Sequence, residues 1–166
     1  MEPNRTGKDQ PYVLERDEGK PIWFLGTLVQ VKAGDEQTNG RFAFVEQELP
    51  AGFAPPRHIH HDADEPFYVL EGRITFFAAG QAIEAGPGTF VWLPKGVEHA
   101  FRVSDAGPAR VLTMTIPAGF DRFVEEAGEP ARELALPPPS DLPPDVQKLV
   151  EIAARYNIEI TGPPPE

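Results

Sequence analysis

Short apolar runs separated by turn residues recur along the first two thirds of the chain and predict a β-rich fold. The runs are rich in β-branched and aromatic residues, which favour strands. Gly and Pro separate them at intervals of about eight to twelve residues, a spacing typical of an all-β sandwich or barrel. We expect a short edge strand at 12–14 and further strands at 22–33, 41–49, 65–70, 73–79, 81–84, 89–93, 97–103 and 109–116.

The apolar spacing lengthens after Pro117 and predicts two helices. The first has apolar residues at helical spacing and ends at Gly128, which suits a C-terminal cap. The second is expected to be capped by Ser140 or Asp141, with the prolines at 143–144 in its first turn. The apolar faces are Phe120, Phe123, Val124 and Ala127 in the first helix, and Val146, Leu149, Val150 and Ala153 in the second.

These patterns divide the chain into three parts. We expect a flexible segment at 1–11, a barrel at 12–117 and a helical, Pro-rich extension at 118–166 that packs on the barrel. The proline runs at 137–139 and 163–165 are typical of semi-rigid extended spacers rather than of a second domain.

The composition narrows the class of protein. The chain has 166 residues, of which 40% are hydrophobic, as expected for one globular domain. Its formal net charge of −11 disfavours nucleic acid and anionic membranes as partners. It contains no Cys, which excludes disulfides and thiolate metal ligands. We find no apolar signal segment and no membrane span, and therefore expect a cytoplasmic protein.

Two histidines with the spacing of strand neighbours are the main candidates for chemistry. His58 and His60 follow Pro55–Pro56, which favours an extended backbone. Residues two apart on a strand point to the same face, so both imidazoles can converge on one ion. Glu65 adds a carboxylate after a short turn, and His99 is the one histidine outside this stretch. A single histidine on a strand would more simply be a core or surface residue.

Two spaced motifs resemble the signature motifs of the cupin superfamily. The first reads G, five residues, HxH, four residues, E, six residues, G, from Gly52 to Gly72. The second reads G, five residues, PxG, two residues, H, from Gly88 to His99. One departure is Val103, where the second motif usually ends in Asn. The resemblance implies a double-stranded β-helix, or jelly-roll barrel, with one divalent metal ion per chain at His58, His60, Glu65 and His99.

Three imidazoles and a carboxylate suit Fe, Mn, Ni, Co, Cu or Zn, and the ligand types alone do not select one metal. Four protein ligands leave positions open on a five- or six-coordinate ion, as a catalytic metal requires. Strand alternation predicts an apolar wall beside the ion. That wall would favour a flat aromatic or apolar ligand over a free sugar, although the same rings can equally serve the core alone. The expected pocket residues are Phe67, Val69, Phe101, Val103 and Phe120.

The runs PPRHIHHDADEPFYVLEG and ARYNIEITGPPP resemble bacterial quercetin 2,3-dioxygenase-like cupins. The resemblance implies an enzyme that binds a flavonol or another metal-chelating enol and inserts both atoms of O2. Glu65 would then be catalytic, as a metal ligand that also takes the substrate's hydroxyl proton. A non-oxidative cupin isomerase or lyase, and a small-molecule-binding cupin without catalysis, are the alternatives.

Two further expectations concern the surface. The segment 22–31 is apolar on both faces in its first half, and cupins bury sheet faces in dimers. We therefore expect a homodimer with Trp23 or Phe24 near the interface. His61 points away from His60 if the strand continues, which predicts a rim or surface position. Its alternative role is a contact to a metal ligand or to substrate.

Overall fold

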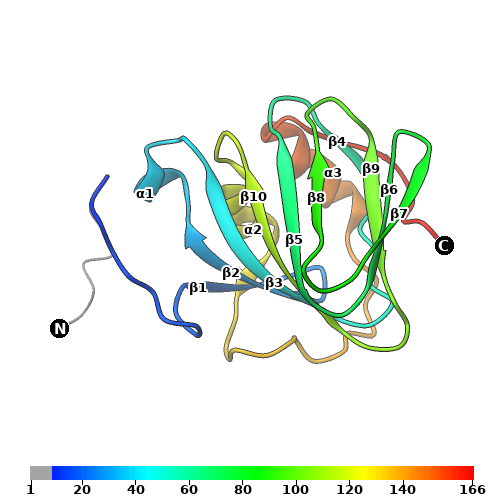
Figure 1. Cartoon of the computed structure of the whole chain (residues 1–166), viewed down its shortest axis with the longest axis horizontal. Helices are drawn as coiled ribbons and strands as arrows, with labels where there is room; N and C mark the ends of the chain where they lie inside the picture. Colours follow the sequence, from blue (N-terminus) through cyan, green and yellow to red (C-terminus); the bar gives the residue numbers. More distant parts are fainter. Residues whose placement is uncertain (1–8) are drawn as a thin grey trace.

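The computed structural model describes residues 9–166, and the strands of this range form two antiparallel β-sheets (Figure 1). The seven-stranded sheet contains, in spatial order, β11 (Glu129–Pro130), β1 (Lys20–Phe24), β2 (Thr27–Ala33), β3 (Ala43–Leu49), β10 (Ala109–Thr115), β5 (Glu65–Glu71) and β8 (Phe90–Leu93). The five-stranded sheet contains β12 (Ile158–Gly162), β4 (Arg57–His60), β9 (His99–Val103), β6 (Ile74–Ala78) and β7 (Gln81–Ala85). The predicted all-β jelly roll with C-terminal helices is confirmed.

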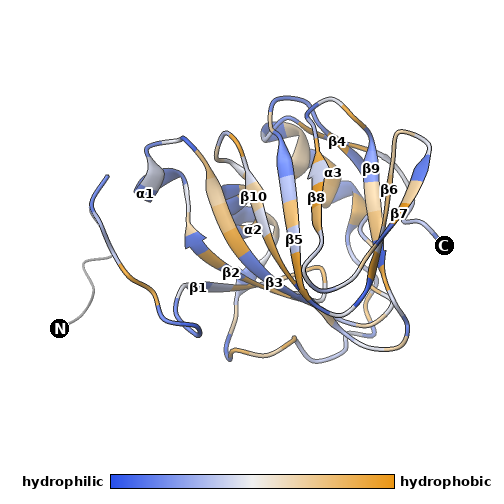
Figure 2. Ribbon diagram, viewed as in Figure 1, coloured by the Kyte–Doolittle hydropathy of each residue, from blue (hydrophilic) through white to orange (hydrophobic). Residues whose placement is uncertain are grey.

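The strands match their sequence-based bounds closely between residues 43 and 115, because alternation and turn residues both mark them. Figure 2 shows the strands banded with hydrophobic and hydrophilic residues, as expected when one face is buried. Two local expectations are wrong. Residues 12–14 form no strand, and the run expected at 22–33 is divided between two strands, β1 and β2. A short helix, α1 (Asp35–Thr38), follows β2. The predicted flexibility of residues 1–11 falls mainly on residues outside the described range.

One core cluster lies between the two sheets and is built from inward-facing strand residues. Three of its rings contact one another, since the ring centroid of Phe67 lies 5.1 Å from that of Phe76 and 5.7 Å from that of Phe101. Such ring pairs stabilise a core by about 0.5–1.5 kcal/mol beyond the area that they bury. This packing fixes β5 against β6 and β9, so it also fixes the positions of Glu65 and His99, which lie on β5 and β9.

A second core cluster joins the other half of the seven-stranded sheet to the helices α2 (Phe120–Ala127) and α3 (Val146–Arg155). Phe123 of α2 packs edge-on against Phe24 of β1, with ring centroids 5.4 Å apart. Val29 and Val45 face the same cluster from β2 and β3. The helices therefore cover the inner face of the large sheet where the smaller sheet no longer reaches.

The second predicted helix forms, but its start is displaced from the prediction. Its N-cap is Asp145, whose carboxylate accepts a hydrogen bond from the backbone N–H of Lys148 at 3.0 Å. The prolines at 143–144 precede the cap instead of occupying the first turn. Of the predicted apolar face, Leu149 and Ala153 are buried, while Val146 and Val150 are exposed. Ile152 takes part in the core in their place.

The C-terminal extension also supplies two strands that the sequence pattern did not predict. β12 pairs with β4, which places Ile158 opposite His60 and Ile160 opposite His58. β11 pairs with β1, and the connector beyond it covers Trp23, whose indole N–H donates to the carbonyl of Ala135 at 2.8 Å.

The apolar pattern around Trp23 is thereby explained within the chain. Trp23 and Phe24 are 7% and 9% exposed, so contacts inside one chain already cover both residues. Within residues 9–166, no helix combines the length and the apolar character needed to cross a membrane.

Candidate metal centre and pocket

Four candidate ligands from three strands meet at one point between the sheets. His58 and His60 lie on β4, Glu65 opens β5, and His99 opens β9. One ligand atom from each of the four side chains lies within 4.8 Å of the others. We call these four residues the His–Glu cluster. His60, Glu65 and His99 are 4%, 3% and 2% exposed, while His58 is partly exposed at the pocket.

Backbone carbonyls orient two of the imidazoles. The Nδ1–H of His58 donates to the carbonyl of Pro56 at 2.7 Å, and that of His99 donates to the carbonyl of Val97 at 3.1 Å. In each case the acceptor lies two residues before the histidine. A neutral imidazole that donates through Nδ1 carries its lone pair on Nε2, where an ion can bind, and this is the usual arrangement of metal-binding histidines. In this structure the Nε2 of His99 contacts Oε2 of Glu65.

The carboxylate of Glu65 lies between two of the rings. Its Oε2 lies 3.1 Å from Nε2 of His60 and 2.9 Å from Nε2 of His99. Burial acts to raise the pKa of Glu65, but the charge and hydrogen bond of His60 and the hydrogen bond from His99 outweigh burial. They hold the pKa of the carboxyl well below its usual value. Glu65 is therefore ionised across the ordinary pH range.

The two histidines of β4 respond differently to this environment. Burial, together with the neighbouring His99 and His60, lowers the pKa of His58 to about 3, so its ring is neutral. Burial also acts to lower the pKa of His60, but the charge and hydrogen bond of Glu65 prevail and raise it. Of the two histidines of β4, the ring that contacts the carboxylate is thus the one whose protonated form is favoured.

The donor set fits a divalent transition metal on three observations. Three imidazoles and one carboxylate are ligands that such ions accept. Their ligand atoms are already within coordination range of a common centre. The buried carboxylate of Glu65 between two imidazoles makes a cation at this point favourable. The spatial convergence matches the sequence-based expectation, and the role of the four residues as metal ligands stays a prediction.

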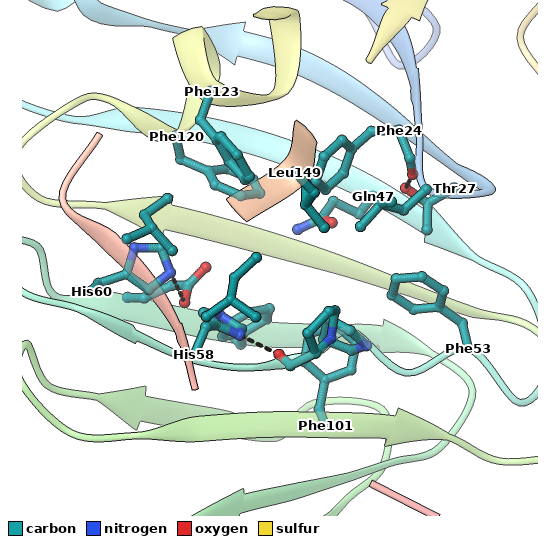
Figure 3. Close-up of a pocket in the computed structure, with 17 residues that line it drawn as sticks. Phe24, Thr27, Gln47, Phe53, His58, His60, Phe101, Phe120, Phe123 and Leu149 are labelled. Atoms are coloured by element: carbon teal, nitrogen blue, oxygen red, sulfur yellow. Dashed lines mark hydrogen bonds and ion pairs between the residues drawn. The ribbon is translucent and has the colours of Figure 1, made fainter. Parts of the chain in front are cut away.

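A largely apolar pocket opens beside the His–Glu cluster (Figure 3). It contains about 600 Å³ of space free of protein atoms, part of which is open to solvent. Its walls come from both sheets, from the hairpin of β1 and β2, and from the helices α2 and α3. The lining residues are Phe24, Leu25, Thr27, Gln47, Phe53, Pro55, Pro56, His58, His60, Glu65, Phe67, Phe101, Phe120, Phe123, Leu149, Ile158 and Ile160.

Of the five residues expected to line the pocket, three line it and two do not. Phe67, Phe101 and Phe120 line it, and the Phe120 ring centroid lies 6.5 Å from that of His60. Val69 and Val103 are fully buried in the core between the sheets and are not among the lining residues. Strand alternation correctly predicted that Val69 and Val103 face inward. It does not show which inward-facing positions along a strand border the cavity and which lie deeper in the core.

Gln47 is the lining residue that sequence reasoning missed with most consequence. It is a polar residue among the inward-facing positions of β3, where its neighbours Val45 and Leu49 are buried and apolar. Its Nε2 donates to Oγ1 of Thr113 at 2.9 Å. Figure 3 shows its amide end turned toward the pocket. The signal was present in the sequence, since a polar side chain in an apolar alternation points to a specific partner.

His61 lies outside the cluster, at the surface position that strand alternation predicted. Its Nε2 contacts Oε2 of Glu159 on β12 at 2.7 Å, and both side chains are more than half exposed. The structure shows no contact between His61 and the four candidate ligands.

Comparisons with known proteins agree with this fold. A family model described as "Cupin domain" matches residues 45–115. Quercetin 2,3-dioxygenase from Bacillus subtilis is 33% identical to the chain over 120 residues, which cover 72% of the chain. These residues cover 35% of that protein, so the chain spans about a third of its length.

Two solved structures show how far the architecture extends. The polyketide cyclase RemF from Streptomyces resistomycificus is 22% identical with a TM-score of 0.57, and the match covers 87% of this chain and 98% of that one. KdgF from Halomonas sp. is 16% identical with a TM-score of 0.58, and the match covers 68% and 98% of the two chains. These likenesses concern the fold. With the matched domain, the two facing sheets and both spaced motifs in place, the chain belongs to the cupin superfamily.

Proposed function

We propose that the chain is a metal-dependent dioxygenase that acts on a flavonol or a similar enol able to chelate a metal ion. The observation that carries the proposal is the location of the His–Glu cluster at the wall of a pocket lined mainly by apolar and aromatic side chains. The similarity to quercetin 2,3-dioxygenase supports the choice among the reactions of cupins, because fold and ligand set alone do not define a reaction.

The cluster would hold one divalent ion through His58, His60, Glu65 and His99. A metal ion bound there would polarise the chelating oxygens of the substrate and permit its reaction with O2. The tied Nδ1 atoms of His58 and His99 keep their rings oriented whether or not an ion is present. Their orientation needs no reorganisation when an ion binds, which favours affinity.

The pocket residues would bind and orient the rings of the substrate. Phe67, Phe101 and Phe120 present aromatic surface on the cluster side, and Phe53 lies beside Phe101 with ring centroids 5.9 Å apart. Apolar walls exclude water and favour a flat aromatic ligand. The side-chain amide of Gln47 donates to Thr113. An amide has further donor and acceptor capacity, so Gln47 can also hydrogen-bond a substrate hydroxyl.

Glu65 is the group placed to take the proton of the substrate hydroxyl. Its Oε2 already accepts from His60 and His99, and none of the hydrogen bonds found among residues 9–166 uses its Oε1. Oε1 is therefore the oxygen available to the substrate. The pKa of Glu65 is strongly lowered, so the carboxylate would accept a proton well only when its interactions with His60 and His99 weaken.

Oxygen uptake by the purified chain tests the proposal. The protein is loaded in turn with Fe²⁺, Mn²⁺, Ni²⁺, Co²⁺ or Cu²⁺ and mixed with a panel of flavonols. We expect metal-dependent O2 consumption. Glu65→Gln should reduce turnover by about 10²-fold or more while changing substrate binding far less, as expected for loss of a general base.

Glu159→Gln is the matched control, because Glu159 is an exposed carboxylate that contacts His61 outside the cluster. It should leave turnover and binding unchanged. Equal losses of turnover and binding in Glu65→Gln would make Glu65 a purely structural ligand. No O2 uptake with any flavonol and any metal would overturn the oxygenase in favour of a non-oxidative or binding cupin.

A further inference from the structure

A buried hydroxyl on β10 has no hydrogen-bond partner. Within the described part of the chain, Oγ1 of Thr115 is the one buried side-chain nitrogen or oxygen without such a partner. Thr115 is 2% exposed, so water does not readily satisfy it. Leaving a buried hydroxyl unpaired costs about 1–3 kcal/mol. A buried polar atom without a partner therefore suggests that it has a function or that it is hydrogen-bonded in another state of the protein.

The strand register places Thr115 beside Glu65. β10 and β5 pair Thr113 with Phe67, and the same register continues to the bridge between Ile116 and Asp64. Thr115 and Glu65 are therefore opposite each other between these two pairs. Opposite residues in an antiparallel pair extend to the same face of the sheet.

The hydrogen-bond pattern makes Glu65 and Thr115 a pair of the kind in which side chains approach each other most closely. Asp64 and Ile116 exchange both backbone hydrogen bonds, at 2.9 and 3.0 Å. They are thus a hydrogen-bonded pair, and the next pair along, Glu65 with Thr115, is a non-hydrogen-bonded pair. In such pairs the Cα atoms lie only about 4.5 Å apart and the side chains approach most closely.

We propose that Thr115 is a positioning residue for the metal-binding carboxylate, with its hydroxyl donating to Glu65 when an ion occupies the His–Glu cluster. In the structure, Oε2 of Glu65 contacts His60 and His99, and the Thr115 hydroxyl has no acceptor. With an ion held by the four residues, Glu65 would be a ligand of that ion, and the hydroxyl of Thr115 would donate to the carboxylate and orient it.

This inference rests on the metal site of the proposed function, but it does not depend on the oxygenase reaction. It gives a role to a polar β-branched residue at a buried position where Val would fill the same space. It also means that β10, a strand that carries none of the four candidate ligands, helps to orient one of them.

Binding of Co²⁺ alone, measured in competition with a chelator of known affinity, tests the inference. Thr115→Val keeps the shape and removes the hydroxyl, and it should weaken Co²⁺ binding about tenfold, in the range found for outer hydrogen bonds to metal ligands. Thr115→Ser restores the hydroxyl and should bind within about threefold of the wild-type chain. If Val is not tolerated, Thr115→Ala replaces it in the comparison with Ser.

A second measurement separates positioning from packing. In urea unfolding of the metal-free protein, Thr115→Val should be as stable as the wild type or more stable, because it removes an unpaired hydroxyl. Thr75→Val on β6 is the control for the same substitution outside the cluster and the pocket, and it should leave Co²⁺ affinity unchanged.

Unchanged Co²⁺ affinity in Thr115→Val would overturn the inference. So would Thr115→Ser binding as weakly as Thr115→Val, since that result would indicate packing instead of hydrogen bonding. Failure of the wild-type chain to bind Co²⁺ would overturn the proposed metal site itself. Loss of O2 chemistry with Co²⁺ affinity as expected would overturn only the reaction.

Discussion

His58 on β4 lies directly opposite His99 on β9, and their ring centroids are 4.5 Å apart. This register pair brings together histidines of the two sequence motifs, which β6 and β7 separate along the chain. Both rings are tied through Nδ1 to a carbonyl two residues before them. The local backbone thus orients each ring, and strand pairing brings the rings together.

Replacing two cluster histidines should remove the metal. We expect His60→Ala combined with His99→Ala to abolish stoichiometric binding of a divalent ion, because a carboxylate and one imidazole remain. The measurement is metal content per chain after equilibration with excess metal and desalting. His61→Ala is the control, since His61 contacts Glu159 outside the cluster, and it should retain one ion per chain. Full occupancy in the double variant would rule out this site.

Acid should release the metal, beginning at His60. Its pKa is raised by the charge and hydrogen bond of Glu65 against the effect of burial, so protons compete with an ion for this ring already above the usual value of about 6.5. We expect metal content to fall as the pH is lowered from 8 to 4. Equilibrium dialysis at a series of pH values measures it. A constant metal content over this range would contradict the prediction.

The metal-free protein should be destabilised by acid through His58. The pKa of this ring is about 3 in the folded chain and about 6.5 when unfolded, so between these values the unfolded chain binds the extra proton. Stability from His58 is thus complete above about pH 6.5 and is lost as the pH falls toward 3. Glu65, with its lowered pKa, acts in the same direction at lower pH.

His60 opposes this trend, because its raised pKa contributes stability below about pH 6.5 that is lost as the pH rises through the folded value. The urea midpoint of the metal-free protein at pH 4, 5, 6.5 and 8 measures the net effect. We expect the midpoint at pH 4 to be clearly lower than at pH 6.5. A higher midpoint at pH 4 would show that the His58 ring is not held neutral.

Gly72 should tolerate substitution much less than Gly80, although both have positive φ, at 81° and 73°. A Cβ on Gly72 would lie 2.5 Å from the carbonyl oxygen of Pro108 and 2.7 Å from Cα of Ala109, whereas nothing lies within 4 Å of one on Gly80. Both substitutions to Ala incur left-handed strain of about 1–2 kcal/mol. Gly72→Ala should lower the free energy of unfolding by about 1–3 kcal/mol more, because backbone must move. Equal losses in urea unfolding would refute the clash.

A homodimer is still our prediction, and the exposed surface indicates a different interface from Trp23 and Phe24. Phe90 and Trp92 on the edge strand β8 are 61% and 49% exposed, and Tyr68, 43% exposed, is the register partner of Phe90. Contiguous exposed apolar side chains of this kind mark interaction surfaces.

Sedimentation at micromolar concentration should show a dimer, and Phe90→Glu combined with Trp92→Glu should convert it to a monomer. Val146→Glu is the control, because Val146 is exposed to a similar degree at 55% but lies on α3. A wild-type chain that is monomeric at this concentration would contradict the prediction.

The sequence by itself determined the strands of the barrel and the four residues that converge in the His–Glu cluster. Alternating apolar residues and turn glycines are local signals, and they define most strands between residues 43 and 115. The HxH spacing places two rings on one face for the same local reason. Glu65 and His99 could be matched because their motifs have fixed spacing.

Tertiary structure alone decided what surrounds the cluster. β12 lies beside β4 although about 100 residues separate Ile158 from His60, and α2 and α3 supply pocket residues such as Phe123 and Leu149. Which segments pack together depends on the free energy of contacts between residues far apart in the sequence. The local spacing of apolar residues does not reveal these contacts. The same reason explains Thr115. A polar residue at an inward-facing position of β10 indicates a partner, but only the pairing of β10 with β5 places Thr115 opposite Glu65.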